Sequence, residues 1–215
     1  MLRAMPRPRK RAVPPETPLD AADLDNDPVK QFTAWFGPRA ASGVPEANAV
    51  TLATATGEGR PHARTVLLKE ATQQGFVFFT NYGSPKARQL TENPWATLVC
   101  YWPEVHRQVV VSGRVSQVTD AESDAYFRTR PRGSQLGAWA SRQSQPIESR
   151  QALERRVAEL DSQYAGRDVP RPLFWGGFRL MPETFEFWQG RTNRLHDRFR
   201  YRKDGGRWVV ERLAP

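Results

Sequence analysis

The chain between residues 48 and 81 is divided into three short strand-like runs, and this pattern limits the fold more than any other feature of the sequence. The runs NAVTLATAT (48–56), HARTVLLKEA (62–71) and GFVFFTN (75–81) are rich in β-branched and aromatic residues. The connections TGEGRP and ATQQG contain glycine and are too short to hold a crossover helix. The runs therefore predict an antiparallel meander.

The rest of the chain adds strands and a few helices to this meander. Gly113 is expected to mark a bulge or bend, Thr119 and Glu122 a capping box, and Pro131 the end of a helix near Thr129. Further strands are predicted over 95–103, 107–119, 174–182, 183–190, 198–203 and 207–215, and helices over 28–36, 84–94, 120–129 and 146–164. This order favours a mainly β fold with flanking helices, a β-barrel with helices packed outside it. Residues 27–215 are expected to form one domain, preceded by a flexible basic arm, residues 1–26.

The net charge of +9 is concentrated in two segments. Residues 1–20 carry five basic and two acidic side chains, and residues 191–203 carry six basic and one acidic. The remaining surface is close to neutral, which is unlike a protein that follows a long phosphate backbone. Binding of nucleic acid through PRPRKRAVPP remains an alternative, but not as the expected main function.

Several other classes are disfavoured by composition. The single cysteine, Cys100, excludes an intramolecular disulfide and a cysteine-based zinc cluster, and its apolar surroundings predict a buried thiol. No apolar stretch approaches the ~20 residues of a membrane span, and no secretory signal is recognisable, so a soluble cytoplasmic protein is expected. The sequence contains no P-loop, H-E-x-x-H or nucleophile motif, and no metal site is expected.

Cations and hydroxyl groups are instead placed at strand ends and helix starts. Arg64 and Lys69 lie five positions apart on one predicted strand, so their side chains are expected on opposite faces. The other polar groups are Thr80, Ser84 and Lys86 around a turn entering a helix, Tyr126, Arg130 and Ser134 at four-residue steps with a loop between them, and Gln143 with Ser144. Together they predict two phosphate-sized anion sites.

The segment EFWQGRTNRLHDRFRYRK (186–203) gathers six basic residues and His196 behind a strand-like run. Such crowding of like charges is unfavourable unless the charges are solvated or meet an anion. With RTVLLK, FFTNYGSPKA, RPRGSQLGAW, SRQSQPI and FWGGFRL, this segment resembles the pyridoxamine 5'-phosphate oxidase family, the FMN-dependent oxidases of vitamin B6 metabolism. The similarity runs in order from about residue 28 to the C-terminal RLAP.

The resemblance implies an FMN-binding split β-barrel that forms a homodimer, with FMN at the subunit interface. The implied FMN-binding residues are Arg64, Thr65, Val66, Leu67, Leu68, Lys69, Phe79, Thr80, Lys86, Gln108, Gln143, Ser144, Trp188 and Arg198. The implied substrate-binding residues are Lys69, Tyr126, Arg130, Ser134, Arg194, Leu195 and His196. Arg194 and His196 are the implied catalytic residues, although a structural hydrogen bond within the turn is the alternative role for His196.

The implied reaction is the oxidation of pyridoxamine 5'-phosphate and pyridoxine 5'-phosphate to pyridoxal 5'-phosphate. A hydride passes from the substrate's C4' carbon to flavin N5, and O₂ reoxidises the flavin and yields H₂O₂. Two positions depart from the family pattern: Pro85 replaces a common arginine at the FMN phosphate, and Phe79 replaces a tyrosine. Without compensation, the missing cation is expected to weaken FMN binding by ~1.5–3 kcal/mol.

Two further alternatives stay open at this point. The first is a related flavin oxidase acting on another substrate, such as a phenazine precursor. The second is a non-catalytic protein that binds flavin or pyridoxal phosphate. Lys69, Tyr126, Arg130 and Ser134 favour a phosphorylated substrate over the first, and Arg194 with His196 favours catalysis over the second.

Overall fold

The computed structural model of the protein describes residues 17–41, 43–44 and 46–215. Its helices are α1 (Pro28–Ala41), α2 (Pro85–Glu92), α3 (Asp120–Thr129), α4 (Arg132–Ala140) and α5 (Arg150–Gln163), with short 3₁₀ turns at Ala21–Asp23, Pro103–Val105 and Thr192–Arg194. Its strands are β1 (Ala49–Ala55), β2 (Pro61–Thr72), β3 (Gly75–Asn81), β4 (Trp95–Trp102), β5 (Arg107–Gln117), β6 (Trp175–Gln189), β7 (Asp197–Asp204) and β8 (Arg207–Leu213).

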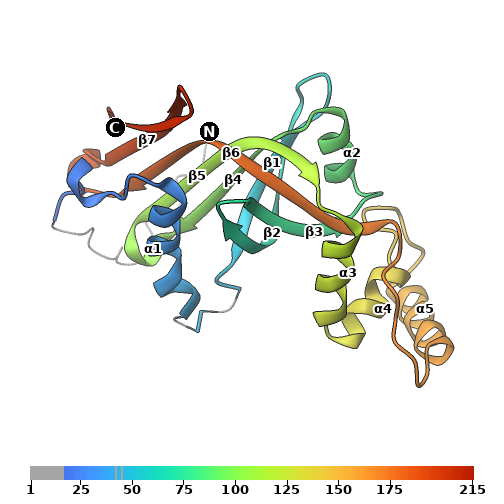
Figure 1. The fold of residues 1–215 in the computed structure, drawn as a ribbon. Coiled ribbons are helices and arrows are strands. Elements are labelled where there is room, and N and C mark those ends of the chain that lie inside the picture. Colours follow the sequence, from blue (N-terminus) through green and yellow to red (C-terminus); the bar gives the residue numbers. More distant parts are fainter. Residues whose placement is uncertain (1–16, 42, 45) are drawn as a thin grey trace, which may run out of the picture.

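Six of these strands close into an antiparallel barrel. The hydrogen-bonded order is β3-β2-β1-β4-β5-β6, and an additional pairing between β3 and β6 completes the closure. Strands β7 and β8 extend the sheet beyond β6. The predicted mainly β barrel with flanking helices is therefore confirmed (Figure 1).

Strand β6 links the two ends of the molecule. Its first half, from Trp175 to Leu180, pairs with β3, and its second half, from Thr184 to Gln189, pairs with β7. Figure 1 shows it running from the end that carries α3, α4 and α5 to the end that carries β7 and the C-terminus. Residues at the two ends of β6 consequently belong to different regions of the protein.

Alternating apolar side chains of the strands fill the barrel, and α1 covers part of it. Phe32 of α1 is fully buried and meets Phe76 of β3 edge-on, with 4.9 Å between the ring centroids. Cys100 lies in the same core, as its apolar context predicts, and burial raises the pKa of its thiol to about 12. The barrel is thus a packed core, so a ligand has to bind at its edges.

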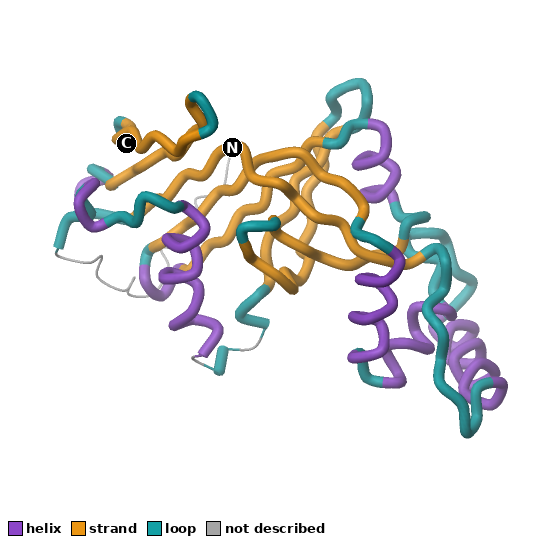
Figure 2. Tube along the Cα trace, in the orientation of Figure 1, coloured by secondary structure: helices purple, strands orange, loops and turns teal. Residues whose placement is uncertain are grey.

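A second, smaller core forms where α3, α4 and α5 gather beside the start of β6 (Figure 2). It contains Phe127, Leu136, Leu160 and Trp175, all less than a tenth exposed. The capping box of Thr119 and Glu122 begins α3, which ends at Thr129, and both predictions are confirmed. These helices hold a wall of side chains against the barrel.

Two elements differ from the prediction. Strand β6 is continuous, although Pro182 separates the two runs predicted from the sequence. The register shifts at Gly113, which pairs with Pro182, and a Cβ on Gly113 would lie only 1.9 Å from the Met181 carbonyl oxygen. This bulge accommodates Pro182, which has no backbone N–H to donate to the neighbouring strand. The other difference is α4, which replaces an expected loop directly after Pro131.

The described part of the expected arm, residues 17–26, contacts the β7–β8 end of the sheet. The Leu19 N–H donates to Asp197 Oδ2 at 3.0 Å, and the Tyr201 hydroxyl donates to the Asp25 carbonyl at 2.7 Å. Arg212 donates to the Leu19 carbonyl and pairs with Asp197. Residues 1–16 lie outside the described residues.

Candidate active site

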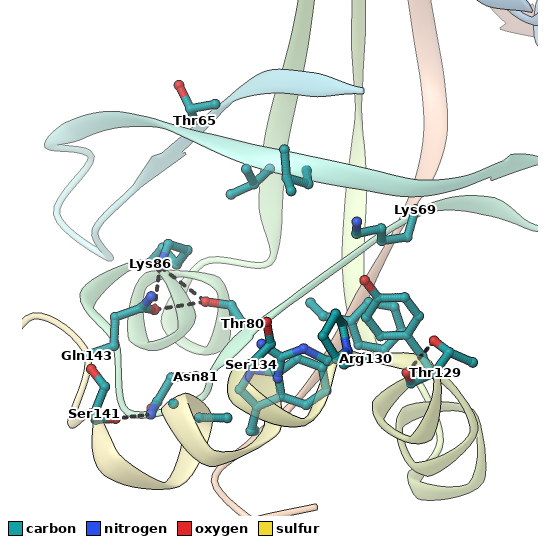
Figure 3. Close-up of a pocket in the computed structure, with 18 residues that line it drawn as sticks. Thr65, Lys69, Thr80, Asn81, Lys86, Thr129, Arg130, Ser134, Ser141 and Gln143 are labelled. Atoms are coloured by element: carbon teal, nitrogen blue, oxygen red, sulfur yellow. Dashed lines mark hydrogen bonds between the residues drawn. The ribbon is translucent and has the colours of Figure 1, made fainter. Parts of the chain in front are cut away.

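A cavity of about 610 Å³ lies between the outer side of β2 and β3 and the helices α3 and α4 (Figure 3). Strands β2 and β3 and the start of α2 contribute Thr65, Val66, Leu67, Lys69, Phe79, Thr80, Asn81 and Lys86. The segment from α3 to just after α4, with the start of β6, contributes Tyr126, Thr129, Arg130, Pro131, Ser134, Gly137, Ala138, Ser141, Gln143 and Trp175. The cavity therefore has one wall from the barrel and one from the small core.

Lys86 occupies one end of the cavity. It lies in the first turn of α2, where free backbone N–H groups favour an anion. Its ammonium group donates to Thr80 Oγ1 at 3.1 Å and to Gln143 Oε1 at 2.8 Å, and Figure 3 shows the three side chains together. Burial and, second, the charge of Arg64 lower the pKa of Lys86 to about 8.

Arg64 lies behind this end without lining the cavity. Its guanidinium donates to Thr54 Oγ1 at 2.6 Å and to Gln89 Oε1 at 3.1 Å. Lys69 of the same strand does line the cavity, so the two cations of β2 take different positions relative to it. Arg64 adds positive potential at the Lys86 end, and burial lowers its own pKa.

The cavity is also lined by Lys69, Tyr126, Arg130 and Ser134, and Figure 3 shows Lys69 and Arg130 at the end away from Lys86. Tyr126 lies in α3, Arg130 is the C-cap residue directly after α3, and Ser134 follows in the first turn of α4. The Lys69 ammonium lies 5.7 Å from the centroid of the Tyr126 ring. The junction of α3 and α4, rather than the expected loop, carries Arg130 and Ser134, and Figure 3 shows both along the cavity with Lys69.

Stacked aromatic rings pack beside Arg130. Tyr126 and Phe79 stack at 4.0 Å between centroids, and Phe79 stacks on Trp175 at 5.4 Å. The guanidinium carbon of Arg130 lies 4.6 Å from the Trp175 ring centroid. Its Nη1 atom is buried without a hydrogen-bond partner, and burial lowers its pKa.

The charges that line the cavity are all positive. Lys69, Lys86 and Arg130 are the charged residues among the described lining, which contains no aspartate or glutamate. A cavity with cations at both ends and no acid selects anions. Its geometry suits a ligand, or two adjacent ligands, with phosphate groups at both ends.

A second group of predicted residues lies at the far end of β6. Trp188 pairs with Gln108 of β5 and with Arg198 of β7, and its ring centroid is 4.7 Å from that of His196. His196 Nδ1 accepts the Arg191 backbone N–H at 3.0 Å. Leu195 is 69% exposed, so this group borders open surface.

Comparisons with known proteins agree on one family. Residues 36–164 match the family model described as "Pyridoxamine 5'-phosphate oxidase". Residues 175–215 match the model "Pyridoxine 5'-phosphate oxidase C-terminal dimerisation region". Together the two models cover both groups of site residues.

The chain belongs to the pyridoxamine 5'-phosphate oxidase family. It is 58% identical over 191 residues to the pyridoxine/pyridoxamine 5'-phosphate oxidase of Rubrobacter xylanophilus, a match that covers 89% of this chain and 88% of the relative. It is 56% identical over 202 residues to the enzyme of the same name from Frankia alni, covering 92% and 84%. This protein is therefore an oxidoreductase of that family.

Two solved structures have a similar fold. A PhzG protein from Burkholderia lata, in complex with tetrahydrophenazine-1-carboxylic acid, superposes with a TM-score of 0.84 at 34% identity, covering 90% of this chain and 95% of that one. A protein from Nostoc punctiforme described as pyridoxamine 5'-phosphate oxidase-related and FMN-binding gives a TM-score of 0.69 at 20% identity, covering 89% and 100%. The second likeness supports the split-barrel fold alone.

The site residues predicted for this oxidase fall into two groups and a few positions beside them. The cavity brings together Thr65, Val66, Leu67, Lys69, Phe79, Thr80, Lys86, Tyr126, Arg130, Ser134 and Gln143. The far end of β6 holds Gln108, Trp188, Arg194, Leu195, His196 and Arg198. Leu68 is buried in the barrel core, and Ser144 follows Gln143 on the surface in a left-handed conformation.

Trp175 is the main lining residue to which the sequence assigns no role. Trp175 lies in the FWGG run, which is typical of the family but does not reveal which residues the ring contacts. Asn81 and Thr129 also line the cavity without having been predicted. These contacts depend on packing between α3, β3 and β6, which lie far apart in the chain.

The described residues also allow two narrower statements. No helix in this part of the chain combines the length and apolar character that a bilayer crossing requires. Within the same residues, no group of three or more histidine, cysteine, aspartate or glutamate side chains is arranged to hold a metal ion.

Proposed function

We propose that this protein is an FMN-dependent oxidase that converts pyridoxamine 5'-phosphate and pyridoxine 5'-phosphate to pyridoxal 5'-phosphate. The observation that carries the proposal is the cavity itself, with cations at both ends and no acid in its described lining. Two phosphate-bearing ligands side by side, a flavin and its substrate, account for both ends. The proposed location is the cytoplasm, because phosphorylated substrates do not readily cross a bilayer.

The residues at the Lys86 end fit the phosphate of FMN. Lys86 and Thr80 supply an ammonium and a hydroxyl group, and the start of α2 supplies backbone N–H groups. Gln143 Oε1 accepts hydrogen bonds from both Lys86 and Thr80. Its amide group can therefore give up one of these hydrogen bonds for a hydrogen bond with the ligand. Arg64 adds charge from behind, which partly offsets the absence of an arginine at Pro85.

The residues at the Arg130 end fit the phosphate of the substrate. Arg130 and Lys69 supply charge, while Tyr126 and Ser134 supply hydroxyl donors. The buried, unpartnered Nη1 of Arg130 supports an anion as the missing partner of this guanidinium.

When bound, FMN supplies a two-electron acceptor at N5 for the hydride from the substrate's C4' carbon, and O₂ then takes the electrons to give H₂O₂. The protein orients the substrate and controls charge and protons. Arg194 is proposed to position the pyridine ring and to offset developing negative charge. His196 accepts the Arg191 N–H at Nδ1, so in the neutral ring Nε2 carries the proton and is the atom proposed to exchange it.

A homodimer is part of the proposal, because the two groups of site residues lie at opposite ends of β6. Trp175 and Trp188 are about 40 Å apart along the strand at roughly 3.3 Å per residue. A two-fold arrangement of two copies places the His196 segment of one over the cavity of the other, with FMN between them. The match of residues 175–215 to a dimerisation region supports this arrangement.

The first test is a visible absorption spectrum, recorded before and after anaerobic addition of pyridoxamine 5'-phosphate. We expect a flavin spectrum that bleaches with substrate and returns when air is admitted. A flavin spectrum that fails to bleach would favour a carrier or another substrate. A protein that remains colourless after FMN is added would contradict the proposed cofactor.

A phenazine-precursor oxidase is the second candidate, because the PhzG structure is similar over 90% of this chain. The cationic Arg130 end favours a phosphorylated substrate over a carboxylated tricyclic one. The same spectral experiment with a dihydrophenazine carboxylic acid separates the two. Faster bleaching by that compound than by pyridoxamine 5'-phosphate would favour the phenazine reaction.

A further inference from the structure

Arg171 and the half-buried Arg130 both contact Trp175 and differ in how their charge is balanced. Arg171 forms ion pairs with Asp120 and Asp124, both at 2.6 Å, and its side chain is 4% exposed. Arg130 has no ion-pair partner among the described residues, and the groups around its guanidinium are aromatic rings. Arg171 is thus neutralised within the fold, whereas Arg130 retains its charge.

The Trp175 ring is fixed more firmly than a surface aromatic. The residue is 7% exposed, and its carbonyl oxygen accepts from Arg171 Nη1 at 2.7 Å. Phe79 stacks on the ring, and Phe127 meets it edge-on with 5.2 Å between centroids. A ring restrained by its backbone and by two neighbours has one available orientation.

An aromatic ring and a carboxylate can both hold a guanidinium in place, but only the carboxylate neutralises its charge. A carboxylate beside Arg130 would neutralise the charge and compete with a phosphate for the same donors. The face of an indole attracts the cation through its quadrupole and leaves the N–H groups at the edge able to bind an anion. The observed distance of 4.6 Å from Arg130 to the Trp175 centroid lies within the range of such an interaction.

We propose that Trp175 is a positioning residue that holds the Arg130 guanidinium toward the cavity without neutralising it, and thereby sets the preference for phosphorylated over unphosphorylated substrates. The inference rests on the proposed function and adds to it a residue that acts through Arg130 rather than by touching the reacting atoms. The Trp175 ring orients the Arg130 guanidinium before the substrate arrives, so the Arg130 side chain loses less conformational freedom when the substrate binds.

The test uses the FMN-loaded protein and a pair of ligands that cannot be oxidised at C4'. These are 4-deoxypyridoxine 5'-phosphate and 4-deoxypyridoxine, which differ only in the phosphate. Calorimetry gives both affinities for the wild type, Trp175→Leu and Trp175→Phe. We expect about a tenfold loss of affinity for the phosphorylated ligand in Trp175→Leu and at most about threefold in Trp175→Phe, which keeps an aromatic face.

Affinity for 4-deoxypyridoxine is expected to change less than about twofold in both variants, and the KM for pyridoxamine 5'-phosphate is expected to rise while kcat stays constant. In an Arg130→Met background, Trp175→Leu should have little further effect, because the group on which the ring acts is gone. Equal weakening of both ligands, or additive effects with Arg130→Met, would overturn the proposal.

A matched control removes a comparable pair outside the cavity. Arg114 lies 5.4 Å from the centroid of Trp95, which is 44% exposed, so Trp95→Leu should leave both affinities unchanged. If Trp175→Leu loses FMN or cooperative unfolding, Trp175→Met replaces it, because methionine fills more of the ring's volume. A wild type that does not distinguish the two ligands contradicts the proposed function, whereas variants that distinguish them as well as the wild type contradict this inference alone.

Discussion

Trp175 and Trp188 lie at opposite ends of the single strand β6, and each belongs to a different half of the candidate site. Trp175 lines the cationic cavity, whereas Trp188 contacts His196 at the other end of the sheet. A rigid paired strand cannot bring its own ends together. In the proposed homodimer, a second copy supplies one half and so brings the two halves together.

Mixing two inactive variants tests this arrangement. Arg130→Glu places an acid in the cavity half, and Arg194→Glu changes the other half. If each site combines halves from two chains, an equal mixture of exchanged subunits contains heterodimers with one intact site, and about a quarter of wild-type activity returns. Activity is measured before and after refolding the variants together, with each refolded alone as the control. No recovery, despite heterodimers detected by mass spectrometry, would place a whole site within one chain.

The proposed contact between Lys86 and the FMN phosphate is expected to make FMN affinity depend on pH. Its pKa is lowered to about 8, chiefly by burial, so above that pH the apoprotein presents a neutral amine to the FMN phosphate. Between pH 7.5 and 9.5 we expect FMN binding to weaken by about tenfold, the value of one charge-assisted contact. Flavin fluorescence quenching measures this. Lys86→Arg retains its charge over the range and should bind FMN with a flatter pH profile.

The same lysine affects the stability of the apoprotein in the opposite direction. Its pKa is lower in the folded state, about 8, than the ordinary value of 10.5 expected in the unfolded chain. Between these values the unfolded state binds more protons, so this residue makes the free energy of unfolding rise with pH. Urea titrations of the apoprotein at pH 7.5 and 9.5, compared with Lys86→Met, isolate the effect. An equal pH dependence in the variant would contradict it.

Asp197 connects residues 17–20 to the segment that contains His196. It accepts from the Leu19 N–H at 3.0 Å and from Arg212 Nη1 at 2.9 Å, and it is 8% exposed. Asp197→Asn should lower stability by about 2 kcal/mol, because hydrogen bonds to a buried charge are lost. Thermal unfolding should shift down by about 4–8 °C. Asp204→Asn removes an exposed carboxylate that pairs with Arg202, and serves as the near-neutral control.

Gly113 permits β5 to approach β6 at the bulge. A Cβ on residue 113 would lie 1.9 Å from the backbone carbonyl oxygen of Met181 and 2.8 Å from the carbonyl carbon of the same residue. Gly113→Ala is expected to cost about 3 kcal/mol or more and to reduce the yield of folded protein. Gly57→Ala, where nothing lies within 4 Å, is the matched control. Equal denaturation midpoints for the two variants would show that the bulge can move.

The sequence by itself determined the local elements and their chemistry. Alternating apolar runs with glycine connections predicted the meander, the pair Thr119 and Glu122 predicted the start of α3, and Pro131 its end, since each signal acts within a few residues. The cations Lys69, Lys86 and Arg130 were recognisable for the same reason. Family-specific runs such as RTVLLK and RLHDR named candidate residues in both groups.

Only the tertiary structure decided how these parts meet. The pairing of β3 with β6, the continuity of β6 through Pro182 and the contact between Arg130 and Trp175 join segments that lie up to about a hundred residues apart. Such contacts depend on how distant surfaces pack, and no local pattern encodes them. For the same reason the sequence named the candidate residues, whereas the length of β6 places the cavity group and the His196 group at its opposite ends.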